Sequence, residues 1–380
     1  MLHELSFWEK NSFLSHIDII IIGSGIVGLN AAISLQEKCP KARIVVLERG
    51  VLPYGASTRN AGFACFGSIS ELLEDLESRS LDEVLALVEK RWKGLQKLRN
   101  RLGDTKIGFE PLGGYEIFTP KEQELYEKCA EKLPFFNQHL AEIIGEKETY
   151  RFSPEKIAQN SFANVQYMIE NVAEGQIDTG KMMSNLLLLA REKGIEILTG
   201  IGVSGIEEGE NEAVIICENG WHISAKQVIV CTNGFAKRLL PALAVNPARN
   251  QVWITKPIKN LALSGTFHYE MGYFYFRNVG NRILLGGGRH LDKVTEHTDE
   301  FGKTDIIQQA LHNLLTQVIF PHKPVAIDMK WSGILGIGEE KKPIIQQVSP
   351  HLYVAVRMGG MGIAIGALVG EEVAALVVGG

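Results

Sequence analysis

The sequence lacks the cysteine patterns of disulfide frameworks and metal sites. Its five cysteines are scattered, their number is odd, and none belongs to a C-x-x-C pair. This spacing argues against both a disulfide scaffold and a zinc site, and the histidines show no metal-ligand spacing. We therefore expect no bound metal. Reduced thiols, and an N-terminus without a basic segment before an apolar run, favour a cytoplasmic protein.

Strong net charge and long unbroken hydrophobic runs are also missing. The formal net charge is only -5 and no long basic stretch occurs, so nucleic acid is not an expected partner. Two apolar stretches, residues 17–35 and 352–378, contain several glycines, and Glu371 and Glu372 interrupt the second. Both are too broken for a lipid-spanning helix, so we expect no membrane span.

The first fifty residues have the pattern of a strand, a helix and a second strand. Ile17 to Ile22 (IDIIII) is an apolar run typical of a parallel strand buried on both faces. A glycine-rich turn and a helical stretch to about Lys38 follow, and then a second apolar run, residues 42–47, ends at Glu48. Together these segments predict one βαβ unit.

The glycine-rich turn between the first strand and the helix predicts a dinucleotide site. Gly23 permits a tight turn, Gly25 leaves no Cβ in front of a diphosphate, and Gly28 allows the helix to pack closely on the strand. The unpaired amides at the helix start attract the phosphates. Glu48, twenty positions after Gly28, can accept both hydroxyls of a ribose. A glycine turn without a ligand is the alternative, and this context disfavours it.

A second glycine pattern, Gly200 to Gly205, leads into an apparent hairpin instead of a helix. Without a helix start it is not expected to bind a diphosphate. Flavoproteins that take hydride from NAD(P)H usually need a second nucleotide site, and the sequence shows none.

The remaining pattern predicts an α/β fold with two domains. A Rossmann-type nucleotide-binding domain is expected to be discontinuous and to comprise residues 1–69, 150–245 and 325–380. A second domain, with a mainly antiparallel β-sheet and helices, is expected to comprise residues 70–149 and 246–324 and to bind the substrate.

Several motifs in the same order resemble the D-amino acid oxidase superfamily, which includes glycine oxidases, sarcosine oxidases and D-amino acid dehydrogenases. The resemblance lies in the GSGIVG turn, Glu48, the STRNAG loop that begins at Ser57, the Thr232-Asn-Gly234 segment and the tail from Trp331 to Gly362. It implies a two-domain protein that binds FAD and holds a small amine or amino acid between the flavin and an antiparallel sheet.

The motifs and the resemblance together predict a set of FAD-binding residues. The tail places Arg357 to Gly362 between a strand and a helix, and the start of that helix could face the flavin pyrimidine, where negative charge accumulates on reduction. A plain packing turn is the alternative. The predicted residues are Gly23, Ser24, Gly25, Ile26, Val27, Gly28, Glu48, Arg49, Ser57, Thr58, Arg59, Asn60, Ala61, Val203, Thr232, Asn233, Gly234, Gly333, Leu335, Met358, Gly359, Gly360, Met361, Gly362 and Ile363.

The strand from Gly272 to Arg277 is the candidate substrate wall. Alternation puts Tyr273, Tyr275 and Arg277 on one face. Tyr273 matches the strand tyrosine that contacts the substrate carboxylate in the resembled oxidases, and the predicted catalytic residues are Tyr273, Arg59 and Arg277. Tyr275 is more simply explained by packing, and Arg59 could instead be a surface arginine that pairs with Glu71 or Glu74.

The sequence also departs from the resembled enzymes. Leu335 and Ala364 stand where glycine oxidases and sarcosine oxidases carry the arginine or lysine that binds the substrate carboxylate, and Leu284 replaces a lysine that assists reaction with oxygen. The electron acceptor is therefore oxygen or another carrier. No cysteine lies between residues 328 and 345, where sarcosine oxidases attach their flavin, so we expect non-covalent FAD.

These observations predict a flavin-dependent oxidoreductase that removes hydride from the carbon bearing an amine. One alternative is a dehydrogenase of a 2-hydroxy acid or polyol phosphate, for which His268, Arg277 and Arg289 could supply a base and anion contacts. A non-catalytic flavin-binding protein is a second alternative, because the carboxylate-binding residues are missing.

Overall fold

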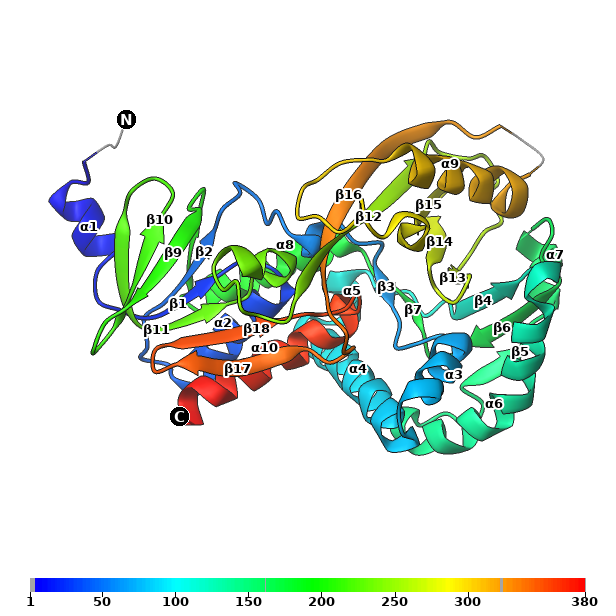
Figure 1. Ribbon diagram of the computed structural model, residues 1–380, viewed down its shortest axis with the longest axis horizontal. Coiled ribbons are helices and arrows are strands. Elements are labelled where there is room, and N and C mark those ends of the chain that lie inside the picture. The colour runs from blue at the N-terminus through cyan, green and yellow to red at the C-terminus, as the bar shows by residue number, and fades with distance from the viewer. Residues whose placement is uncertain (1–3, 161, 322–323, 380) are drawn as a thin grey trace.

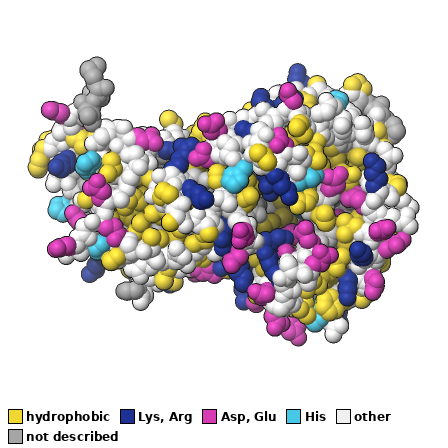
Figure 2. Space-filling model, viewed as in Figure 1, with side chains coloured by type: hydrophobic (Ala, Val, Ile, Leu, Met, Phe, Trp, Pro, Cys, Tyr) yellow, Lys and Arg dark blue, Asp and Glu magenta, His cyan; other side chains and the backbone are white. Residues whose placement is uncertain are grey.

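Two eight-stranded sheets organise the chain, each at the centre of one lobe (Figure 1). The computed structural model describes residues 4–160, 162–321 and 324–379. The predicted fold class is confirmed: a Rossmann-type α/β lobe stands beside a second lobe with a mainly antiparallel sheet. A space-filling view shows a hollow where the two lobes meet, with hydrophobic side chains in its depth and charged side chains at its rim (Figure 2).

The first sheet has the strand order β17-β18-β11-β1-β2-β8. The five strands from β18 to β8 are parallel, β17 pairs antiparallel at one edge, and the hairpin β9–β10 joins β11. Its strands are β1 (Ile17–Ile22), β2 (Ile44–Glu48), β8 (Glu196–Thr199), β9 (Val203–Glu208), β10 (Ala213–Cys217), β11 (His222–Val230), β17 (Ile344–Ser349) and β18 (Leu352–Val356).

Strand β1 is central because both of its faces are apolar. Ile19 and Ile21 pack with the helices on one side, and Ile20 and Ile22 pack with β10 and β11 on the other. The helices that supply this first core are α2 (Ile26–Lys38), α4 (Leu81–Leu102), α8 (Thr179–Glu192) and α10 (Gly362–Gly379).

Helix α10 packs on α2 through glycines spaced four residues apart. A Cβ on Gly366 would lie 2.5 Å from the Ile26 side chain, and one on Gly370 would lie 2.7 Å from the Ala31 backbone nitrogen. By length and hydropathy α10 could cross a membrane, yet half of its residues are buried in the protein. The close contact with α2 explains why an apolar helix lies in this core.

The second sheet has the order β16-β12-β15-β14-β13-β4-β6-β5, and among the described strands only β13 and β4 pair in parallel. Phe267, Phe276 and Leu285 pack on one face of it with α9. Its strands are β4 (Gly114–Phe118), β5 (Tyr150–Phe152), β6 (Tyr167–Asn171), β12 (Asn246–Thr255), β13 (Thr266–Tyr269), β14 (Phe274–Val279), β15 (Arg282–Gly287) and β16 (Ile327–Ile337).

Short elements complete the fold. A two-stranded sheet of β3 and β7 lies between the lobes, and helices α3 and α6 cover the end of the second sheet (Figure 1). These elements are α1 (Phe7–Phe13), β3 (Phe63–Ala64), α3 (Ile69–Ser78), α5 (Asp104–Ile107), α6 (Gln123–Ile144), α7 (Glu155–Asn160), β7 (Gly175–Gln176) and α9 (Asp305–Leu314), with short helical turns η1 (Ala56–Thr58), η2 (Pro120–Glu122), η3 (Asn233–Arg238), η4 (Arg289–Asp292) and η5 (Leu315–Ile319).

Strand pairing differs from the predicted division of the chain at three strands. Strands β5 and β6 fall in the range 150–245 and β16 falls in the range 325–380, which were expected in the nucleotide-binding domain. All three pair within the second sheet, β6 with β4 and β16 with β12. Apolar alternation indicates a strand but does not identify the strand with which it pairs. The positions at which the chain passes from one lobe to the other could therefore not be predicted from the sequence.

The contact between α10 and α2 can be tested with one substitution. Gly370→Ala should lower the free energy of unfolding by about 1–2 kcal/mol, because the added methyl group meets the backbone of α2 and the better helix propensity of alanine offsets only part of that cost. Urea denaturation measures the change. Gly379→Ala is the matched control, since a Cβ there meets nothing within 4 Å. Equal stability of both variants would refute the close contact.

Candidate functional site

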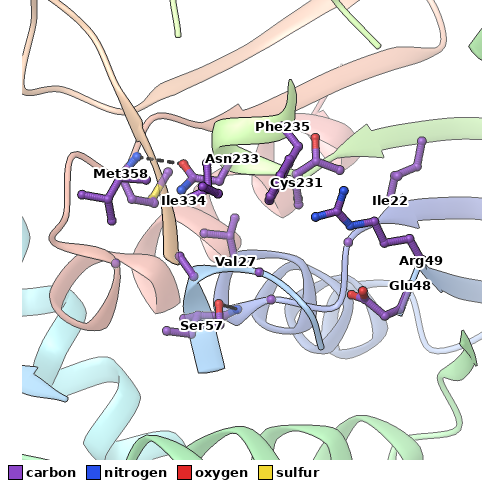
Figure 3. A pocket seen from close by; sticks show the side chains of 18 of the residues that line it. Ile22, Val27, Glu48, Arg49, Ser57, Cys231, Asn233, Phe235, Ile334 and Met358 are labelled. Carbon is purple, nitrogen blue, oxygen red and sulfur yellow. Dashed lines mark hydrogen bonds between the residues drawn. The ribbon is translucent and has the colours of Figure 1, made fainter. Parts of the chain in front are cut away.

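An elongated cleft of about 1250 Å³, partly open to solvent, runs along the carboxyl ends of β1 and β2 and reaches β16 of the second sheet (Figure 3). Such a place, above the strand ends of a parallel sheet, is where open α/β folds bind nucleotides. The predicted residues that line it are Gly23, Gly25, Ile26, Val27, Glu48, Arg49, Ser57, Asn60, Val203, Thr232, Asn233, Leu335, Met358, Gly360, Gly362 and Ile363.

The glycine turn has the geometry that the sequence indicated. Gly23 adopts a φ of +106°, which favours glycine, and a Cβ on Gly28 would lie 2.0 Å from the Gly23 carbonyl oxygen. Gly25 precedes the first residue of α2 and leaves the helix start open toward the loop that carries Ser57. The Ile26 amide donates to Ser57 Oγ at 2.9 Å, so a side-chain oxygen already occupies the position where a helix start attracts an anion (Figure 3).

Glu48 is fixed at the other end of the turn. Its Oε2 accepts hydrogen bonds from the Ser24 amide at 3.1 Å and the Ser24 hydroxyl at 2.7 Å, and its Oε1 accepts from the Gly50 amide at 3.0 Å. The carboxylate is 95% buried and borders the cleft. The Glu48 carboxylate is therefore held in place as an acceptor for a polar ligand. Ser24 contributes by holding this carboxylate through its two hydrogen bonds.

Asn233 joins two motifs that are far apart in the sequence. Its Oδ1 accepts from the amides of Arg357 at 3.1 Å and Met358 at 3.2 Å, at the start of the turn that leads into α10 (Figure 3). Asn233 and Arg357 both adopt positive φ, at +47° and +67°. Non-glycine residues in this conformation are strained and are held by their surroundings. Asn233 thus positions the turn before α10.

The glycines of that turn are required by backbone conformation. Gly359 and Gly360 have φ values of +59° and +85°, and a Cβ on either would meet nothing within 4 Å. Close packing between α10 and the sheet therefore does not explain Gly359 and Gly360. The alternative interpretation, a turn whose glycines serve only packing, does not hold for these two residues. Gly360, Gly362 and Ile363 line the cleft, so the start of α10 opens toward it.

The loop after Ser57 turns its side chains in several directions. Thr58 is exposed and donates to the Pro53 carbonyl, away from the cleft. The Arg59 guanidinium stacks 4.2 Å from the centre of the Phe301 ring and donates to the Ser332 carbonyl. The suggested surface pairing of Arg59 is wrong, because Arg59 forms no ion pair with any described residue, while Glu71 pairs with Arg91 and Lys341.

The predicted catalytic residues Arg277 and Tyr273 lie in different surroundings. Arg277 is buried, and its Nε and Nη2 donate to the carbonyl oxygens of Ala61 and Ile177, so it holds the loop at Gly62. Burial lowers the pKa of this guanidinium to about 10. Tyr273 precedes β14, and its ring lies 4.4 Å from the His290 ring. Arg277 therefore has a structural explanation.

Some predicted residues do not line the cleft, and other lining residues were missed. The predicted residues that are not among those lining the cleft are Ser24, Gly28, Thr58, Arg59, Ala61, Gly234, Gly333, Gly359 and Met361. Phe235 and Arg238 were missed, although they stand within four residues after the Thr232-Asn-Gly234 motif and could have been predicted from it. Glu218, from the hairpin turn after β10, was also missed, and no sequence motif indicated that it lines the cleft. Among the described residues no group of histidine, cysteine or acidic side chains could hold a metal ion.

Comparison with known proteins agrees with this geometry. The family described as FAD dependent oxidoreductase matches residues 18–376. A Haemophilus influenzae protein named Probable oxidoreductase OrdL is 22% identical over 96% of this chain and 84% of its own length. The fold is shared with glycine oxidase from Geobacillus kaustophilus (TM-score 0.75, 21% identity, 95% and 94% of the two chains) and with L-proline dehydrogenase from P. horikoshii (TM-score 0.74, 19% identity, 96% and 93%).

The residues of the cleft fit FAD. The start of α2, where the Ile26 amide now donates to the Ser57 hydroxyl, suits a diphosphate that would replace this hydroxyl as the acceptor. The buried Glu48 at the end of β2 suits a ribose, and the open turn at Gly360 suits the flavin end. Because Gly359 and Gly360 leave space that side chains would occupy, the turn can approach a planar ring closely.

The role of Asn233 in positioning the turn before α10 can be tested by substitution. Asn233→Ala should weaken FAD binding by about tenfold, since two backbone amides lose their acceptor and the turn loosens. Asn233→Asp keeps an acceptor oxygen and should bind FAD more tightly than the alanine variant. Titration of the apoprotein with FAD, followed by fluorescence quenching, gives the dissociation constants. Wild-type affinity in Asn233→Ala would contradict the positioning role.

We also expect the cofactor to be released by denaturation. Cys231 borders the cleft, but burial raises its pKa to about 12, so the thiol stays protonated and is a poor nucleophile. Acid precipitation should leave all the flavin in the supernatant. A denatured chain that retains the added mass of a flavin would contradict this expectation.

Proposed function

Since the chain belongs to the FAD-dependent oxidoreductase family, we propose that it oxidises a small amine or amino acid at the carbon bearing the nitrogen. FAD supplies the acceptor for the hydride, and the protein supplies orientation and a dry pocket. The five cysteines are all free, which supports our expectation of a cytoplasmic location.

The observation that carries the proposal is the continuity between the cleft and one face of the second sheet. Asn60 lines the cleft, and the next residue, Ala61, packs directly on Val252 and Leu284 of that sheet. A flavin bound at the start of α10 would therefore lie beside this face. Its apolar character excludes water, which protects a reactive imine and strengthens the polar contacts that remain.

The polar groups on this face come from Tyr275 and Asn250. Their side chains are joined by a hydrogen bond of 3.3 Å from Asn250 Nδ2 to the Tyr275 hydroxyl, and the Tyr275 ring lies over Gly286, where a Cβ would be 2.6 Å from the hydroxyl. Both are uncharged hydrogen-bonding groups. They suit an amine or a hydroxyl of the substrate better than a carboxylate, which charged donors bind more strongly.

The arginines near this face are already engaged. Arg277 donates to two carbonyls, Arg59 stacks on Phe301 and bonds to Ser332, and Leu335 lines the cleft in place of an anion-binding side chain. A carboxylate beside the amino group would therefore find no free guanidinium fork among these residues. We expect amines that lack this carboxylate to be the better substrates.

Anaerobic reduction of the flavin tests the proposal. Purified protein should be yellow, and at least one amine from a panel of primary and secondary amines should bleach the flavin absorbance, whereas 2-hydroxy acids and polyol phosphates should not. Bleaching only by a hydroxy acid would favour a hydroxy acid dehydrogenase, and a yellow protein that no compound bleaches would favour a non-catalytic flavin protein.

Reoxidation of the reduced flavin, measured after the anaerobic reduction, tests the electron acceptor. Leu284 is buried in one cluster with Val252 and Ala61 and brings no positive charge to this face of the sheet. We therefore propose that an acceptor other than oxygen is used, and expect the reduced protein to reoxidise more slowly with air than with a quinone or an artificial dye. Faster reoxidation by oxygen would make the protein an oxidase.

A further inference from the structure

A buried carboxylate lies beside the candidate substrate face and is not among the residues that line the cleft. Glu174 is 1% exposed, and its Oε1 accepts hydrogen bonds from the amides of Phe66 at 2.9 Å and Gly67 at 3.1 Å. Its Oε2 occupies space that exists because residue 114 is glycine, since a Cβ there would lie 2.1 Å from this oxygen. Backbone amides and a missing side chain thus fix the carboxylate in one orientation.

The free oxygen of Glu174 faces His268. The distance between Glu174 Oε2 and His268 Nε2 is 4.0 Å, and Nε2 is buried without a hydrogen-bond partner among the described residues. A buried polar nitrogen without a partner is costly, which makes it an indicator of function. His268 can therefore still accept a hydrogen bond or a proton from a ligand.

His268 belongs to the same sheet face as the polar groups assigned to the substrate. It stands opposite Tyr275 in the pairing of β13 with β14, so both side chains project from one face. Its ring packs edge-on against Phe63 at 5.2 Å, and Phe63 also packs against Tyr275. Phe63 follows the loop residues Ser57 and Asn60 that line the cleft.

Several ionisable groups surround the pair of Glu174 and His268. Arg91 of α4 donates to the Phe66 carbonyl and to Glu71 of α3, and Lys341 also pairs with Glu71. The other ionisable groups nearby are the Cys65 thiol, the Tyr150 hydroxyl, which donates to the Gly67 carbonyl, and Glu116, which stands opposite His268 on β4 and accepts from Ser70. Burial raises the pKa of Glu174 to about 8 and lowers the pKa of His268 to about 4.

We propose that His268, positioned by Glu174, accepts the proton that the substrate ammonium must lose before it is oxidised. This inference rests on the proposed function. The N–H bond breaks and its proton moves to Nε2, while the electron pair stays on the substrate nitrogen. The C–H bond then gives its electron pair as hydride to FAD, the nitrogen lone pair completes the C=N bond, and water hydrolyses the product. When Glu174 is ionised, its Oε2, 4.0 Å from Nε2, stabilises the imidazolium that results.

The test follows flavin reduction by the most effective amine of the panel, anaerobically, from pH 6 to pH 10. His268→Asn should reduce the rate at pH 7 by about a hundredfold, within the range for loss of a general base. The loss should shrink toward pH 10, where the free amine is already neutral. Glu174→Gln should shift the pH profile. Glu170→Gln is the matched control, because Glu170 is another buried acid but lies on the opposite face of the same sheet, and it should leave the profile unchanged.

A wild-type rate at every pH in His268→Asn would overturn the inference while the proposed function stood. If no amine reduces the wild-type flavin, the proposed function and the inference fail together. FAD affinity of each variant must match that of the wild type, which shows that the site is intact.

A second measurement needs no substrate. Because the folded pKa of Glu174 lies above its unfolded value, its protonation stabilises the fold at low pH, and that contribution is lost as the pH rises toward and through about 8. The unfolding free energy of the wild type should therefore fall between pH 7 and 8.5, and Glu174→Gln should reduce that fall. An equal fall in both proteins would overturn the assigned role of Glu174 and, with it, the inference.

Discussion

The close approach of α2 to the end of β1 is the constraint on which the site depends. Gly28 stands so near the Gly23 carbonyl that any side chain would force the helix away from the strand. With the helix held there, its first amides point into the cleft and the carboxylate that ends β2 faces the same space. Glycine at three positions thus converts an ordinary strand–helix connection into a place where a diphosphate and a ribose can be bound side by side.

A second set of contacts connects the nucleotide-binding lobe to the second sheet, beside which we place the substrate. Asn233 holds the turn before α10, and α10 packs on α2 through Gly366 and Gly370, so both helix starts belong to one rigid unit. Across the cleft, Arg277 uses its guanidinium to tie the loop at Ala61 to the second sheet. This arginine therefore joins residues 61 and 177 to the second sheet through hydrogen bonds to their carbonyls. The face that results is apolar with a few uncharged polar groups, which distinguishes it from a carboxylate-binding site.

Local patterns were enough to predict much of this arrangement from the sequence. The strands Ile17–Ile22 and Leu352–Val356, the glycine turn and Glu48 follow from apolar runs and residue spacing, which depend on neighbours in the chain. The partners of β6 and β16 did not follow, because pairing is decided by contacts between distant segments. For the same reason the contacts of Arg277 could not be predicted: alternation placed it on the face it shares with Tyr275, but the carbonyls to which it donates come from residues 61 and 177.

Binding of FAD by a Gly25→Val variant tests the central claim most directly. Gly25 has a φ of -74°, which any residue can adopt, and a Cβ there would lie 2.9 Å from Ser57 Oγ, so the substitution fills the space before α2 without straining the backbone at this position. Wild-type protein should take up one FAD for each chain, and the folded variant, checked by circular dichroism, should take up none. A variant that binds FAD with wild-type affinity would show that the diphosphate does not lie at the start of α2.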